Sequence, residues 1–239
     1  MKYVHLFETA SEFEEAYNGS GYTEPWVSYT QQNSTVNYNK RSHDFVDLGL
    51  TSGNLWSTTN VGADAPEDFG NYYAWGEIEE KTTYNWTTYK LCNGSYNTLT
   101  KYNTSGSYGT VDNKEVLDSD DDVASVEWGD GWRMPTYDDF EELLNETDNT
   151  WETLNGVYGR RFTSKTDSTK SIFIPAAGLQ WGEDEPVESG EGEWGAVWSA
   201  SLGDYPTYAW DLDFASDGCD SGSSDRAHGY PVRPVLSQD

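Results

Sequence analysis

The chain has 239 residues and a formal net charge of −28 at neutral pH, from 42 acidic and 14 basic side chains. This charge disfavours binding to nucleic acid and to anionic membranes, because no basic stripe is present to displace counterions from phosphates. Aromatic residues make up 15% of the sequence, and glycine is frequent, with 23 residues. Large rings joined by many turns indicate a loop-rich α+β domain rather than a helical bundle.

The sequence predicts neither a membrane span nor an export signal. No apolar run approaches the ~18 residues that a spanning helix needs, and residues 1–15 lack the apolar core of a signal peptide. The two cysteines, Cys92 and Cys219, form neither a disulfide framework nor a CxxC pair. The sequence leaves open whether they bridge each other.

Residues 1–40 are predicted to form an N-terminal adaptor. Thr9 and Glu12 have the spacing of a capping box, which predicts a short helix, and residues 26–39 are typical of a small hairpin. A segment this short buries too little apolar surface to be stable alone. We therefore expect it to dock on the main domain, residues 41–239, or on a neighbouring subunit.

The first half of the main domain is predicted to contain strands followed by a long irregular segment. Strands are predicted at 43–50 and 54–58, joined by a turn that ends at Gly53. Residues 72–77 are rich in aromatic side chains that we expect to pack in the core. The polar segment 78–115 has no periodicity and is predicted to be irregular.

Two helices follow. The first, 118–128, carries Asp120, Asp121 and Asp122 near its N-terminus, where the helix dipole favours acidic side chains. These residues lack the spacing of an EF-hand loop, so helix capping is preferred to calcium binding. Thr136 and Asp139 are predicted to cap the second helix, whose apolar face is Phe140, Leu143 and Leu144.

Strands are expected again after the second helix. They are predicted at 150–154, 156–163 and 171–178, and the last of these is the most apolar run of the chain, typical of a central buried strand. Residues 183–193 are acidic and rich in glycine, which predicts a loop.

The C-terminal stretch, 194–235, has an unusual composition. The last glutamate before it is Glu193, and from there to Ser237 the chain contains no Glu, Lys, Gln or Met. A sparse framework of apolar and arginine residues alternates with positions that follow no periodicity. The framework residues are Trp198, Ser199, Ala209, Trp210, Leu212, Phe214, Arg226, Gly229, Val232, Arg233 and Pro234.

Four segments together resemble the Fibrobacter succinogenes major paralogous domain, which belongs to the C-type-lectin-like, formylglycine-generating-enzyme-like fold. The segments are 46–77, 128–144, 171–179 and 197–235. The resemblance implies an α+β, C-type-lectin-like fold with two helices, a small antiparallel sheet and long loops. It also implies that the first and last strands pair, and residues 43–50 and 231–236 are suitable partners.

The C-terminal stretch more particularly resembles the variable regions of proteins that diversity-generating retroelements target in Bacteroidetes and their phages. In that class, error-prone copying of adenines changes asparagine codons into codons that cannot encode Glu, Lys, Gln, Met or Trp. The resemblance implies a variable, ligand-binding face within 197–230. Its predicted residues are Val197, Gly203, Asp204, Tyr205, Thr207, Tyr208, Asp211, Asp213, Asp217, Cys219, Ser221, Ser223, Ala227 and His228.

The function implied is recognition without catalysis, by a phage tail receptor-binding protein or a surface adhesin on the virion or the cell exterior. The partner would be a surface protein or glycan, and residues 1–40 would join a neighbouring virion or surface subunit. Tyrosine side chains such as Tyr205 and Tyr208 suit this role because they offer rigid, amphipathic contact area.

Two alternatives stay open. The first is a fixed glycan- or protein-binding module of a bacterial surface. The second, an enzyme of the formylglycine-generating type, is disfavoured because those enzymes use a pair of cysteines near the C-terminal core, where this chain has only Cys219. No cofactor is expected. Calcium is a weaker option, since Glu185-Pro186-Val187 is only a fragment of the lectin calcium motif.

Overall fold

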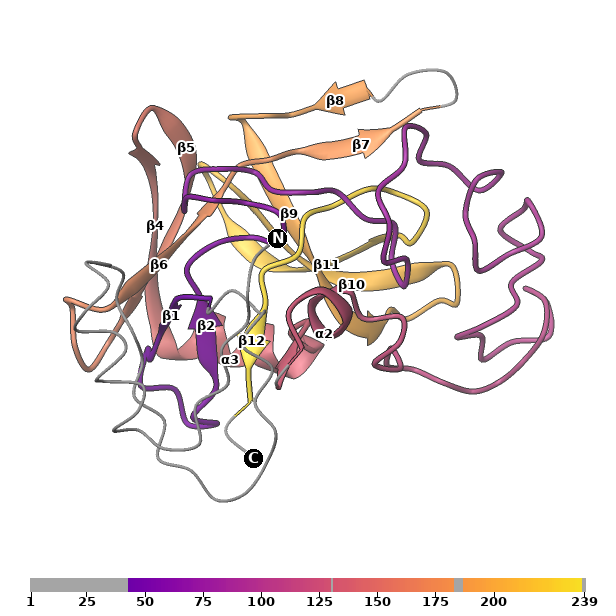
Figure 1. The fold of residues 1–239 in the computed structure, drawn as a ribbon, viewed down its shortest axis with the longest axis horizontal. Coiled ribbons are helices and arrows are strands. Elements are labelled where there is room, and N and C mark those ends of the chain that lie inside the picture. The colour runs from indigo at the N-terminus through magenta and orange to yellow at the C-terminus, as the bar shows by residue number, and fades with distance from the viewer. Residues whose placement is uncertain (1–42, 130, 183–186, 238–239) are drawn as a thin grey trace, which may run out of the picture. The chain divides into compact units, whose positions relative to one another are not determined.

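The structure is a computed structural model that describes residues 43–129, 131–182 and 187–237. The predicted adaptor at 1–40 lies outside the described residues. The described chain has an α+β fold with two helices and several small antiparallel sheets (Figure 1). Neither of these helices is long and apolar enough to cross a membrane.

A four-stranded antiparallel sheet joins the two ends of the described chain. Its strands, in spatial order, are β1 (Phe45–Val46), β2 (Leu55–Ser57), β12 (Val235–Leu236) and β3 (Trp132–Arg133). The predicted pairing of the first and last strands is wrong, because β12 pairs with β2 and β3, whereas β1 pairs only with β2. Trp56 and Val235, which face each other across β2 and β12, are fully buried, while Phe45 is 51% exposed. The pair of strands with buried apolar side chains, β2 and β12, therefore lies inside the sheet, and β1 lies at its edge.

A second sheet follows the longer helix. It contains β4 (Thr147–Leu154), β5 (Val157–Ser164) and β6 (Ser171–Pro175), in that spatial order. The prediction that 171–178 is buried is confirmed, but its central position is wrong, because β5 lies between the other two. The tight turn at Asn155-Gly156, with positive φ at both residues, sets the β4–β5 pairing.

Helix capping is confirmed at Asp122 and Thr136, although the first helix begins at Val123 and not at Asp118 as predicted. Asp122 is the N-cap of α2 (Val123–Glu127), and its side chain accepts a hydrogen bond from the Ser125 backbone N–H. Thr136 and Asp139 form a reciprocal capping box at the start of α3 (Tyr137–Glu146). Asp139 also accepts hydrogen bonds from Arg133 and Asn54, so the cap of α3 is tied to the four-stranded sheet.

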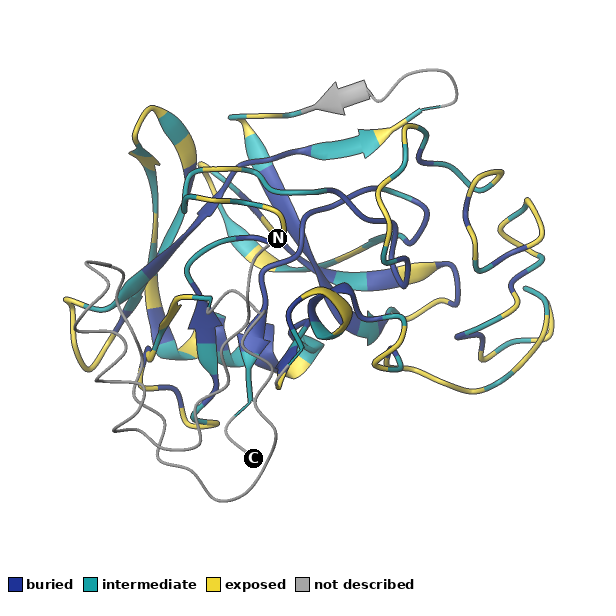
Figure 2. Cartoon of the chain, viewed as in Figure 1, coloured by how far each residue is buried: buried dark blue, intermediate teal, exposed yellow. Residues whose placement is uncertain are grey.

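The C-terminal stretch forms a third sheet, which carries most of the predicted site. Its strands, in spatial order, are β11 (Cys219–Asp225), β10 (Tyr208–Ala215) and β9 (Trp194–Leu202). One face, with Val197, Leu212 and Phe214, belongs to the same buried cluster as Phe140 and Leu143 of α3. Figure 2 shows β9 as buried along most of its length.

The long segment between β2 and α2 contains no named helix or strand in the described chain, as predicted for 78–115. Buried tyrosines hold it in place, including Tyr84, Tyr89 and Tyr102. The predicted loop at 183–193 is partly wrong, because β8 (Val187–Ser189) lies in it and pairs with β7 (Leu179–Trp181). Residues 183–186 lie outside the described chain.

Candidate functional site

The predicted site residues occupy three kinds of position in the third sheet and its connections. Six are exposed, namely Asp204, Tyr205, Tyr208, Asp213, Asp217 and Ser223. Four are partly exposed, namely Gly203, Cys219, Ser221 and His228. Four are buried, namely Val197, Thr207, Asp211 and Ala227. Val197 and Ala227 lie inside apolar clusters, so their side chains are not presented to a ligand in solution.

The exposed residues at the β9–β10 turn form an aromatic surface together with the start of α3. Tyr205 is 59% exposed, and its ring meets that of Tyr208 edge-on at 6.1 Å between centroids. Trp210, two residues further along β10, packs against Tyr137, with 4.5 Å between centroids. We call Tyr137, Tyr205, Tyr208 and Trp210 the turn patch.

Tyr137 is a member of the turn patch that the sequence did not identify. It opens α3, far from the C-terminal stretch in sequence, and only the packing of α3 against β10 brings it to Trp210. The pKa of its hydroxyl is raised, first by desolvation and then by nearby carboxylates that include Asp204. The turn patch is thus an aromatic surface bordered by negatively charged side chains, and none of its four residues is basic.

A buried arginine fixes the base of the β9–β10 turn. Arg226, which follows β11, is fully buried. Its guanidinium donates to the Tyr89 hydroxyl at 2.7 Å and to the Pro206 carbonyl at 2.9 Å. It also donates to the carbonyls of Tyr102 at 2.8 Å and Lys101 at 3.0 Å. One side chain therefore joins the turn, the end of β11 and the long irregular segment.

Aromatic rings complete the surroundings of this guanidinium. Its central carbon lies 4.8 Å from the Trp75 ring centroid and 5.3 Å from that of Tyr89. The Tyr89 hydroxyl in turn donates to the Trp75 carbonyl at 2.7 Å. None of the carboxylates in the described chain forms an ion pair with Arg226. Its charge is held by carbonyl dipoles and ring faces instead.

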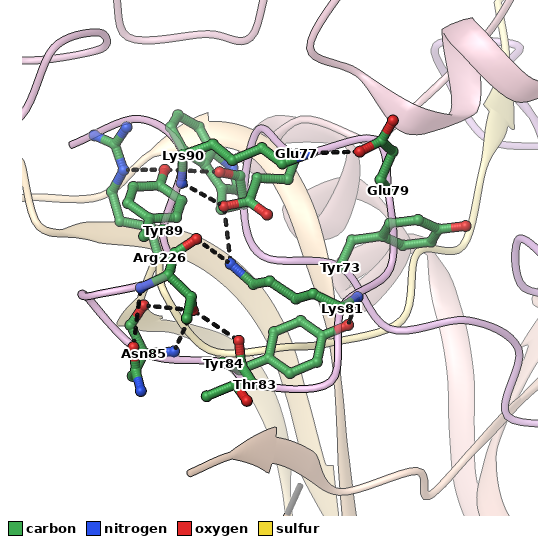
Figure 3. Close-up of polar contacts among 12 residues, drawn as sticks. Tyr73, Glu77, Glu79, Lys81, Thr83, Tyr84, Asn85, Tyr89, Lys90 and Arg226 are labelled. Atoms are coloured by element: carbon green, nitrogen blue, oxygen red, sulfur yellow. Dashed lines mark hydrogen bonds and ion pairs between the residues drawn. The ribbon is translucent and has the colours of Figure 1, made fainter. Parts of the chain in front are cut away.

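A second polar network lies beside Arg226 (Figure 3). Glu77, which is 4% exposed, accepts from the Lys81 ammonium at 2.9 Å and from the Lys90 backbone N–H at 2.7 Å. Burial lowers the pKa of Lys81, and the Glu77 carboxylate opposes that change. The Lys81 ammonium also lies 5.4 Å from the Tyr84 ring centroid. These contacts fold residues 77–90 against the core, so we assign the network a structural role.

The opposite end of the β10–β11 hairpin contains Asp217 and Cys219. Cys219 packs against the cluster beneath α3, and burial raises the pKa of its thiol to about 12. Both Cys219 and Cys92 are free thiols, which answers the question of their pairing. In the described chain, no group of three His, Cys, Asp or Glu side chains is arranged to hold a metal ion.

No family model, curated protein or solved structure shows a significant match to this chain. The evidence for a function of this chain therefore lies in its own geometry and in the pattern of residues in its C-terminal stretch.

Proposed function

We propose that this chain is a ligand-binding protein in which a C-type-lectin-like scaffold displays a retroelement-diversified surface. Its partner would be a surface protein or glycan, met by the chain on a phage tail or as a cell-surface adhesin. The observation that carries the proposal is that the framework residues in and after the third sheet are buried, whereas six of the fourteen predicted variable residues are exposed.

Almost all of the framework residues are buried. Eight residues that the sequence assigns to the framework are at most 1% exposed, namely Trp198, Ser199, Ala209, Leu212, Phe214, Arg226, Val232 and Arg233. Six of the predicted variable residues are exposed on the same strands and turns. Changes at these six positions alter the surface but leave the buried contacts in place, which a diversified binding protein requires.

The turn patch supplies the contact area that recognition needs. Tyrosine and tryptophan are enriched among the residues that dominate binding energy, because each covers a large area with few rotatable bonds. The backbone beneath Tyr205 and Tyr208 is held by the Arg226 bond to the Pro206 carbonyl and by the bond from the Arg226 backbone N–H to the Thr207 carbonyl, 3.0 Å. A fixed turn lowers the entropy lost when a partner binds.

The Tyr205→Ala/Tyr208→Ala variant is expected to lose binding to those strains of a Bacteroidetes cell panel that the unaltered protein binds. The loss should be at least about tenfold, since a central aromatic residue commonly contributes 1–2 kcal/mol or more. Binding would be measured with labelled protein by flow cytometry. Tyr96→Ala/Tyr158→Ala is the matched control, because these tyrosines are 52% and 50% exposed on other parts of the domain.

The control variant should bind as the unaltered protein does, and both variants should have unchanged melting temperatures. Equal losses in the two variants, or full binding by the turn-patch variant, would contradict the proposal. The retroelement part has a separate test: sequencing of the neighbouring DNA should find a near-identical template repeat that differs at adenines. A sequence of this face that is fixed across isolates would favour the alternative of a fixed binding module.

A further inference from the structure

The face of the third sheet that points away from α3 carries three aspartates. Asp213 of β10 is paired with Asp220 of β11, and Asp211 is paired with Gly222. Side chains of paired residues lie on the same face of a sheet, as do those two positions apart. Asp211, Asp213 and Asp220 therefore share one face, which we call the carboxylate face.

Gly222 allows two of these carboxylates to converge. A Cβ atom at residue 222 would lie 2.5 Å from Oδ2 of Asp213 and 2.8 Å from Oδ1 of Asp211. Both distances are shorter than a carbon–oxygen contact permits, so the two side chains occupy the space that any larger residue at 222 would need. The carboxylates of Asp211 and Asp213 thus point toward the same place above the strand.

The negative charge of this face is not matched by the protein. None of the ion pairs in the described chain includes Asp211, Asp213 or Asp220. Asp211 is only 1% exposed, yet its Oδ2 has no hydrogen-bond partner. A buried carboxylate oxygen without a donor is costly, and a ligand that brings positive charge would offset that cost.

The pKa values of Asp211 and Asp213 agree with this lack of positive charge. Burial raises the pKa of Asp211 to about 7, although a hydrogen bond with the Ser224 side chain opposes the rise, and the charge of Asp213 adds to it. Burial also raises the pKa of Asp213, and the charge of Asp220 adds to the effect. A bound cation would lower both pKa values.

Aromatic rings border the carboxylate face. The Tyr230 hydroxyl donates to Ser224, at 3.1 Å, and its ring lies 6.3 Å from those of both Trp194 and His228. His228 lies 6.1 Å from Trp181, which is 56% exposed. Burial lowers the pKa of His228, so this imidazole is neutral near pH 7 and does not repel a cation.

We propose that the carboxylate face binds an organic cation, in the form of an arginine or lysine side chain presented by a protein partner. Carboxylates supply charge-assisted hydrogen bonds to such a group, and neighbouring ring faces add cation–π attraction. The exposed Asp213 and Asp220 would meet the ligand, with Asp211 behind them. An overall charge of −28 further favours encounter with a basic partner.

Asp213 is also one of the six exposed residues of the proposed variable surface, so the proposal rests in part on the proposed function and deepens it by assigning a ligand class to the face of the sheet opposite to Leu212 and α3. A metal ion fits less well, since no group of three ligating side chains in the described residues is arranged to hold one. The two faces can be tested independently. The turn-patch variant Tyr205→Ala/Tyr208→Ala should bind a cationic probe as well as the unaltered protein does.

The probe is a short peptide, acetyl-Gly-Arg-Arg-Gly-amide, titrated into the full chain and followed by tryptophan fluorescence and by calorimetry. Its partner peptide carries citrulline, an uncharged analogue, in place of each arginine. The arginine peptide should bind with a Kd on the order of 1 mM or tighter, as expected for a few charged contacts. The citrulline peptide should bind at least about tenfold more weakly.

Two variants localise the binding. Asp213→Asn/Asp220→Asn should lose at least about tenfold in affinity for the arginine peptide. Asp44→Asn/Asp148→Asn removes the same charge from exposed positions elsewhere and should retain binding. Gly222→Ala leaves the net charge unchanged and places a methyl group against Asp211 and Asp213, so it should also weaken binding.

Several results would overturn the assignment. These are equal binding of the arginine and citrulline peptides, equal losses in the two Asp→Asn variants, or no binding of the arginine peptide at a concentration of about 10 mM, well above the expected Kd. Displacement of the peptide by millimolar calcium but not by sodium at equal ionic strength would assign the face to a metal instead.

Discussion

Replacing Arg226 by methionine is expected to lower the free energy of unfolding by about 3–5 kcal/mol. Methionine fills a similar volume but donates no hydrogen bond, so the Tyr89 hydroxyl and the carbonyls of Lys101, Tyr102 and Pro206 would lose a donor that they have at present. Most of these bonds are buried, where water does not replace the missing donor. Chemical denaturation monitored by tryptophan fluorescence would measure the change.

The control for this substitution is Lys90→Met. The Lys90 side chain is 53% exposed and pairs with Glu79, which is 73% exposed, so its loss should change the free energy of unfolding by no more than about 0.5 kcal/mol. Arg226→Lys should lower the free energy of unfolding by an amount between those of the two methionine variants. An ammonium keeps the charge but cannot reach all four acceptors. A change of less than about 1 kcal/mol in the methionine variant would show that Arg226 does not hold the turn.

The substitution Asp211→Asn is expected to stabilise the protein at pH 8 and to have little effect near pH 4. The folded-state pKa of Asp211, about 7, is raised above its value of 3.8 in an unfolded chain. Between these two values the folded state binds a proton that the unfolded state does not. The contribution of Asp211 to stability therefore falls as the pH rises from about 4 to about 7 and is constant above that range.

Asparagine removes this dependence because it does not ionise. The stability difference between the variant and the unaltered protein should grow from pH 4 to pH 7 and then level off, at a value on the order of 4 kcal/mol. Carboxylates with lowered pKa values, such as those of Asp139 and Asp112, produce the opposite slope. That slope is present in both proteins and cancels in the difference.

Denaturation would be measured at pH 4, 5, 6, 7 and 8, with Asp148→Asn as the control, since Asp148 is exposed. The difference in stability between Asp148→Asn and the unaltered protein should be small at every pH. A difference for Asp211→Asn that is constant with pH, or that shrinks as the pH rises, would mean that the folded-state pKa of Asp211 is not raised.

The sequence predicts well where contacts are local. The capping box of Thr136 and Asp139 joins residues three apart, and both the cap and the inward face of α3 are confirmed. The irregularity of 78–115 also follows from composition, because the polar run offers no apolar face to a sheet or helix, but its buried tyrosines were not predicted. Predictions of this kind depend on side chains whose partners lie within one or two turns of the chain.

Predictions fail where the partner is distant in sequence. The resemblance suggests a pairing of the first and last strands, but the choice between β1 and β2 depends on which strand buries its side chains against Val235. Arg226 is recognisable as framework, yet its partner Tyr89 is 137 residues away. Nothing in the sequence of the C-terminal stretch indicates that Trp210 packs against Tyr137 of α3.

The burial of Asp211 shows the same limit within a single strand. Alternation along β10 places Asp211 and Asp213 on one face, and the pattern alone predicts equal exposure for the two. The segment after β11 brings Tyr230, which is buried, over part of this face, where its hydroxyl bonds to Ser224. Asp211 is consequently enclosed, while Asp213 stays exposed.

The position of β12 has a consequence for how the protein is made. This strand lies between β2 and β3, so the four-stranded sheet cannot close until the ribosome has released Val235 and Leu236. Until then, Trp56 has no strand against it on that side, and slow long-range pairing must finish the fold. Since β9–β11 are synthesised before β12, a substitution in these strands that prevents the last strand from docking would leave the four-stranded sheet open and expose Trp56. Proteases would cleave such a chain faster than the closed one.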